Sequence, residues 1–69
     1  MNIEWYEVWA NEGLPVPYIL ILRPSSDAFE ILDPKEGNRK VFEARSYEDA
    51  KMWLMEDEYE FVGRKEGDE

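Results

Sequence analysis

The feature that most constrains the fold is a run of five consecutive apolar residues, from Tyr18 to Leu22. Successive side chains of a strand point to opposite faces of its sheet, so this run would present apolar side chains on both faces. That pattern is typical of a central strand that is at least partly covered on each side. We therefore predict that residues 18–22 form the middle strand of a sheet.

Four further segments are rich in the aromatic and branched side chains that strands prefer. They are residues 3–10, 28–32, 40–44 and 59–62. Turn-forming sequences join the earlier segments, and the prolines of the Pro15–Pro17 connection force extended backbone that lacks two hydrogen-bond donors. The spacing predicts that the first four strands form a meander.

One segment has helical rather than strand periodicity, and it begins at Ser46. Ser46 and Asp49 resemble a capping box in which aspartate replaces glutamate. Apolar residues then recur at helical spacing and define a buried stripe, with Met52 and Met55 flanking it. The stripe consists of Tyr47, Ala50, Trp53 and Leu54.

These elements predict an α+β fold with an antiparallel sheet of four to five strands in the order 4-3-2-1-5. One α-helix packs across one face and returns the chain, so that the fifth strand lies antiparallel beside the first. The 69 residues suffice for one domain, which we expect over residues 1–62. Residues 63–69 are polar and are expected to form a disordered tail that ends a complete chain.

The composition argues against catalysis and against metal or cofactor sites. His, Cys and Thr are absent, and the three serines fall in a turn or at the helix start. Serine needs a base to become a nucleophile, and zinc and copper favour His or Cys ligands. Neither a calcium-loop pattern nor a phosphate-binding glycine loop occurs. We therefore expect no enzymatic activity, no metal and no cofactor.

The charge and hydropathy pattern narrows the partners and the location. The formal net charge is −9, and a surface this acidic repels phosphate backbones, which disfavours nucleic acid as a partner. No apolar run is long enough to span a membrane, and the N-terminus lacks the features of a signal peptide. The absence of cysteine suits a reducing compartment, so we expect a cytoplasmic protein.

An acidic run follows the predicted helix and is the first candidate site. Glu56, Asp57, Glu58 and Glu60 lie where the helix dipole is negative. Each acid close to the dipole costs about 0.3–1 kcal/mol, and a basic partner would offset this cost. In the alternative interpretation, the helix ends early and the acids simply face water.

Two tryptophans of the first strand are the second candidate site. Trp5 and Trp9 share one strand face with Glu7, and a core this small cannot bury every indole completely. We expect at least one of the two to stay partly exposed, whereas the helical phase of Trp53 places it in the core. Tryptophan is enriched in the hot spots of protein interfaces, which makes this face a candidate for partner binding.

Three functional hypotheses follow. The leading one is a small protein-interaction module that binds a protein partner through the aromatic strand face or a sheet edge. The alternative is an acidic inhibitor or immunity-type protein that masks a basic surface. A small metal- or metabolite-binding protein is the most distant alternative. Both a monomer and a homodimer paired through an edge strand are compatible with the sequence.

Overall fold

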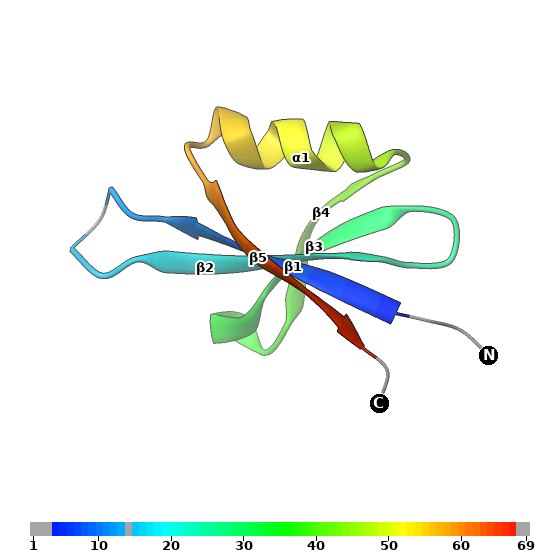
Figure 1. The fold of residues 1–69 in the computed structure, drawn as a ribbon, viewed down its shortest axis with the longest axis horizontal. Coiled ribbons are helices and arrows are strands. Elements are labelled where there is room, and N and C mark those ends of the chain that lie inside the picture. The colour runs from blue at the N-terminus through cyan, green and yellow to red at the C-terminus, as the bar shows by residue number, and fades with distance from the viewer. Residues whose placement is uncertain (1–3, 14, 68–69) are drawn as a thin grey trace.

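The computed structural model describes residues 4–13 and 15–67 (Figure 1). These residues form a five-stranded sheet, one short 3-10 turn and one α-helix. Their bounds are β1 (Glu4–Asn11), β2 (Tyr18–Pro24), β3 (Phe29–Asp33), η1 (Pro34–Glu36), β4 (Arg39–Ala44), α1 (Tyr47–Glu56) and β5 (Glu60–Gly67). Every neighbouring pair of strands is antiparallel, and the order is β4-β3-β2-β1-β5. The predicted α+β class and strand order are confirmed.

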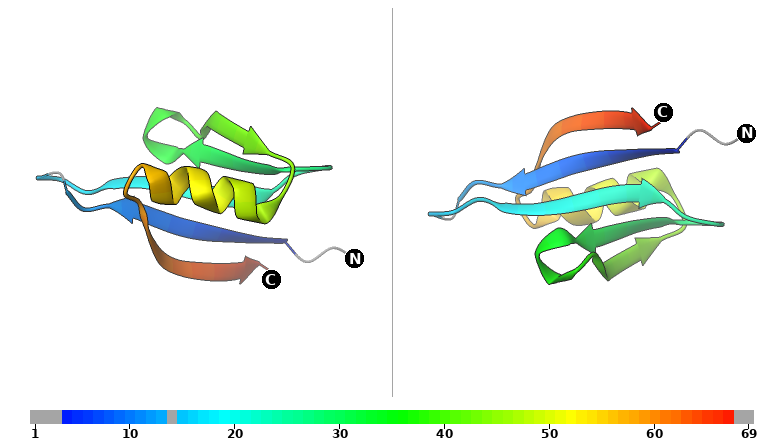
Figure 2. Two further views of the ribbon diagram at one scale, coloured as in Figure 1. Left: turned by 90° about the horizontal axis from the view of Figure 1, so that it is seen from above. Right: turned by 90° about the horizontal axis from the view of Figure 1, so that it is seen from below.

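The central position of β2 confirms the prediction from the apolar run. Leu20 and Leu22 are buried on the face that α1 covers, whereas Ile19 and Ile21 are half-buried on the other face. Figure 2 shows α1 lying across one face of the sheet, and the described residues place no α-helix on the opposite face. The described part of the chain contains no helix long and apolar enough to cross a membrane.

The core lies between α1 and the sheet, as the predicted stripe requires. Ala50 and Leu54 of α1 are fully buried, while Tyr47 and Trp53 are half-buried and pack against the edge of this core. The buried cluster comprises Trp9, Leu20, Leu22, Ile31, Ala50, Leu54 and Tyr59. Residues from β1, β2, β3 and α1 therefore share one apolar interior.

The helix begins and ends with defined hydrogen bonds. The Ser46 hydroxyl accepts a hydrogen bond of 3.1 Å from the backbone N–H of Asp49, which confirms the predicted cap. At the other end, the Tyr59 N–H donates to the Leu54 carbonyl at 2.9 Å. The Glu58 N–H donates to the Met55 carbonyl at 3.0 Å, and these two hydrogen bonds together form a Schellman motif.

The last strand is longer than the sequence predicts. β5 continues to Gly67, so the predicted strand end at residue 62 and the disordered tail are wrong for residues 63–67; residues 68–69 lie outside the described part. Glu7 pairs with Arg64, and Tyr6 pairs with Lys65. Local polarity suggested a tail, but the eight-residue β1 offers these residues a hydrogen-bonding partner, which local composition does not reveal.

Candidate functional site

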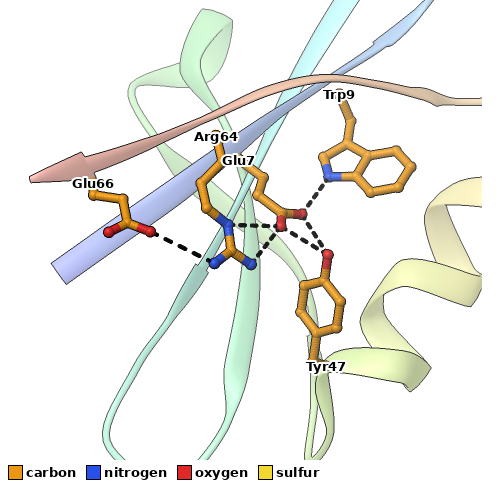
Figure 3. Close-up of polar contacts among 5 residues, drawn as sticks. All are labelled: Glu7, Trp9, Tyr47, Arg64 and Glu66. Carbon is orange, nitrogen blue, oxygen red and sulfur yellow. Dashed lines mark hydrogen bonds and ion pairs between the residues drawn. The ribbon is translucent and has the colours of Figure 1, made fainter.

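A buried carboxylate, Glu7, is the centre of a polar network on the helix-covered face (Figure 3). The residue is 1% exposed. Its oxygens accept hydrogen bonds from Trp9 Nε1 at 3.0 Å and from Tyr47 Oη at 2.7 and 3.0 Å. They also accept bonds from Arg64, whose Nε lies at 3.2 Å and Nη2 at 2.8 Å.

Each member of this network is positioned by regular secondary structure. Trp9 lies two residues beyond Glu7 on β1 and so shares its face. Arg64 is the register partner of Glu7 on β5, and Tyr47 is the first residue of α1. The network therefore ties β1 to α1 and β5, whose contributing residues lie 40 and 57 positions from Glu7 in the sequence.

The bonds saturate the Glu7 carboxylate. One hydrogen comes from Trp9, one from Tyr47 and two from Arg64, which matches the roughly four lone-pair sites of a carboxylate. Burial and the bond to Glu7 raise the pKa of the Tyr47 phenol, and the same carboxylate raises the pKa of the Arg64 guanidinium. A charge so fully engaged suits an anchor for the fold rather than an acid–base group.

The two candidate tryptophans differ in their surroundings. Trp9 is 2% exposed and its ring meets Phe61 edge-on at 5.6 Å, so Trp9 presents almost no surface to a partner. Trp5 is half-buried, as expected for one of the two, and the Arg64 guanidinium lies 4.1 Å from the centre of its ring. The glutamate between the two indoles faces inward because Arg64 compensates its charge.

A second polar cluster fastens the β3–β4 connection to β2. Asp33 is 5% exposed and accepts hydrogen bonds from the Tyr18 hydroxyl and from the Lys35 N–H. The Lys35 Nζ also lies 5.1 Å from the centre of the Tyr18 ring. The hydrogen bond to Asp33 raises the pKa of Tyr18 to about 12. Both hydrogen bonds hold the η1 turn in place.

The predicted acidic residues are all exposed, but the structure does not gather them into one site. Glu58 and Glu60 line a hollow of about 500 Å³, here called the acidic hollow, together with Glu12 from the β1–β2 connection. Met55, Tyr59, Asn11 and Gly13 complete its wall. Within residues 4–13 and 15–67, no cluster of acidic side chains is arranged to hold a metal ion.

Glu56 faces a different depression, which sequence reasoning missed. This β4–α1 groove has a volume of about 480 Å³ and is lined by Phe42, Glu43, Ala44, Arg45, Asp49, Met52, Trp53 and Glu56. The rings of Phe42 and Trp53 stack at 4.7 Å with an interplanar angle of 11°. Met52, at the side of the predicted helical stripe, is 53% exposed. The position of Met52 beside the stripe is a sequence signal for exposed apolar surface. The groove itself arises only when α1 packs on β4.

The β4–α1 groove and the acidic hollow both combine apolar and charged side chains. The β4–α1 groove also lies beside the main chain of an edge strand, because β4 is the last strand on one side of the sheet. An edge strand presents N–H and C=O groups that another strand can bind. No protein-family model, curated protein or solved structure matches the chain.

Proposed function

We propose that this chain is a small protein-interaction module that binds an extended segment of a partner protein at an edge of its sheet. The observation that supports this most strongly is the position of edge strand β4 beside the β4–α1 groove. In strand addition, main-chain hydrogen bonds supply affinity and side-chain pockets supply specificity. The edge and the groove offer both.

The side chains of the groove strengthen the proposal. Met52 is 53% exposed, and the stacked rings of Phe42 and Trp53 are half-buried, so apolar and aromatic surface is accessible beside the strand edge. Aromatic and methionine side chains are enriched at interfaces. We propose a binding protein rather than an enzyme. We also propose a cytoplasmic location, which the cysteine-free sequence supports.

Selection from a phage-displayed library of random linear peptides tests the proposed function. We expect enriched peptides to alternate apolar side chains and to slow hydrogen exchange in one edge strand, because added main-chain bonds protect its amide groups. Replacing a central residue of each peptide by proline removes one donor and should weaken binding. Selected peptides that leave exchange in both β4 and β5 unchanged would rule out binding at a sheet edge.

An acidic inhibitor or immunity-type protein is the second candidate function. The acidic hollow favours it, because Glu12 joins Glu58 and Glu60 around the apolar Met55. A lysine or arginine side chain of a basic partner fits such surroundings, with its stem on Met55 and its charge among the carboxylates.

Binding to a panel of basic proteins tests the second candidate. The Glu58→Gln/Glu60→Gln variant should lose affinity, whereas Glu36→Gln/Glu48→Gln, with the same change in net charge at other exposed positions, should retain it. Affinity should also fall with added salt, because charges are screened over about 10 Å at 0.1 M. Equal losses in both variants would show a general charge effect and reject the acidic hollow as the site.

A further inference from the structure

Building on the proposed function, we infer that the partner segment adds to β4 rather than to β5, and that it is an extended peptide in which basic and apolar side chains alternate. The proposed function leaves open both the edge and the chemistry of the occupant. The shape and charge of the surface along β4, and the differences between the two edges, support this choice.

Two depressions meet along the end of β4. The β4–α1 groove and a second depression of about 680 Å³, here called the turn hollow, share Glu43, Ala44 and Arg45. The turn hollow extends from these residues to Asp27 and Ala28 at the β2–β3 turn. An extended segment lying along residues 43–45 would border both depressions. Because its side chains alternate in direction, it could place successive side chains in different surroundings.

The groove selects an apolar side chain on one side of that segment. Ala44 contributes only a methyl group, and the space beside it is bounded by Met52 and Trp53. Phe42, stacked on Trp53, closes the apolar wall. A branched aliphatic side chain of the partner would remove this surface from water, at a gain of about 25 cal/mol per Å² of apolar area.

The charged residues around the two depressions favour a basic side chain in the partner. Asp27, Glu43, Asp49 and Glu56 line the two depressions, whereas Arg45 is the one basic residue of their combined lining. Glu43 is already paired with the Lys40 ammonium at 2.7 Å, which leaves Asp27, Asp49 and Glu56 against the single guanidinium. A lysine or arginine in the partner therefore meets complementary charge. Such a segment would also be attracted from a distance by the net charge of −9.

The two edges differ in the side chains that an added strand would meet. On β5, Phe61 and Val62 expose apolar surface, but they lie where the register with β1 shifts between Val8 and Trp9. The regularly paired Arg64, Lys65 and Glu66 are all exposed charges, and Arg64 is already bonded to Glu7. Arg64 and Lys65 would oppose a basic peptide there, as Arg39 and Lys40 would at the start of β4, so charge alone does not choose the edge. On β4, residues 42–44 pair regularly with 29–31 and lie beside the apolar wall. Edge β4 therefore fits the proposed occupant better.

The test uses a short synthetic peptide in which lysine and valine alternate, titrated into the isotope-labelled full chain. The indole N–H resonances of Trp53 and Trp5 act as reporters, because Trp53 lines the groove whereas Trp5 packs against Arg64 of β5. We expect the Trp53 resonance and the amide resonances of residues 43–45 to shift, with hydrogen exchange slowing at β4. A peptide with glutamate in place of lysine should bind about tenfold more weakly or not at all.

Two methionines of α1 provide matched variants. Met52 and Met55 are 53% and 52% exposed, but Met52 lines the groove whereas Met55 lines the acidic hollow. Met52→Lys should lower affinity for the lysine–valine peptide by about tenfold, which corresponds to about 1.4 kcal/mol. Met55→Lys, with the same charge change on the same helix, should have a smaller effect. Ala44→Trp fills the groove and should also abolish binding.

The outcomes separate this inference from the proposed function. Shifts at Trp5 and protection at β5 would overturn the choice of edge and leave binding at a sheet edge in place. If Met52→Lys and Met55→Lys lowered affinity equally, the interaction would be unspecific charge attraction, and the inference would be overturned. The same would follow if a peptide with its lysines and valines in separate blocks bound equally well. Failure of both synthetic peptides to bind would overturn the predicted occupant, while the peptide selection described above tests sheet-edge binding separately.

Discussion

At the residue scale, Glu7 shows how a small core accommodates a carboxylate. It lies between two indoles on a strand that faces the helix, a position where burial of an unpaired charge would be strongly unfavourable. Arg64 supplies the opposite charge from β5, and Trp9 and Tyr47 supply the remaining donors. Within the described residues, every buried side-chain nitrogen and oxygen has a hydrogen-bond partner.

Replacement of Glu7 by glutamine should destabilise the chain by about 1–3 kcal/mol, because the new amide N–H₂ faces donors and leaves them unsatisfied. Urea unfolding measures this change. A double-mutant cycle with Glu7→Leu and Arg64→Leu provides the control. Arg64→Leu should lower the free energy of unfolding more in the wild type than in the Glu7→Leu background, because only the wild type is left with an unpaired buried charge. Equal effects in the two backgrounds would contradict the anchoring role.

The pKa of Tyr18 predicts a loss of stability in alkali. The hydrogen bond to Asp33 raises this pKa from 10.0 to about 12, so the folded chain keeps a proton that the unfolded chain releases. The resulting stabilisation is complete below pH 10 and disappears as the pH rises towards 12. Tyr18→Phe should flatten the fall in unfolding free energy over this range. NMR titration of the phenol in Asp33→Asn should show a lower pKa, and an unchanged pKa would refute the assigned cause.

At the element scale, the end of α1 is formed by a residue that is poorly suited to its backbone conformation. Glu58 has a φ of 65°, in the left-handed region that glycine adopts without penalty. The Schellman bonds from Glu58 and Tyr59 hold it there, and Tyr59 packs with Leu54 in the core. The sequence predicted an unfavourable helix end because acids lie at the negative end of the dipole, and the structure shows how tertiary packing holds the turn.

Glu58→Gly should therefore stabilise the chain by roughly 0.5–1 kcal/mol, the net of relieved left-handed strain and the greater entropy of an unfolded glycine. Glu58→Ala removes the same charge but keeps the Cβ atom, so its gain should be smaller. Thermal unfolding of the three proteins under one set of conditions compares them. If alanine stabilised as much as glycine, charge rather than backbone conformation would be the cause.

At the scale of the whole molecule, the excess of acids opposes the compact state. The net charge is −9, and self-repulsion among solvated carboxylates is screened by salt. We expect the purified chain to unfold cooperatively in the presence of a chelator, with a Tm that rises as sodium chloride is added. Calorimetry with comparison of the calorimetric and van't Hoff enthalpies measures this. A transition that requires a metal ion, or a Tm that falls with salt, would contradict the prediction.

The five strands, the single helix and its start at Ser46 could be predicted from local rules: alternation in strands, helical spacing in the stripe and the short-range bond between Ser46 and Asp49. The strand order followed from a rule of topology, a meander whose last connection is a helix that returns the chain. Two other features depend on contacts between segments that are distant in the sequence. Arg64 belongs to β5 because it lies opposite Glu7, 57 residues away, and the β4–α1 groove exists because Phe42 and Trp53 meet from separate elements. Pairing and packing between distant segments depend on the partner residue, which no local pattern specifies.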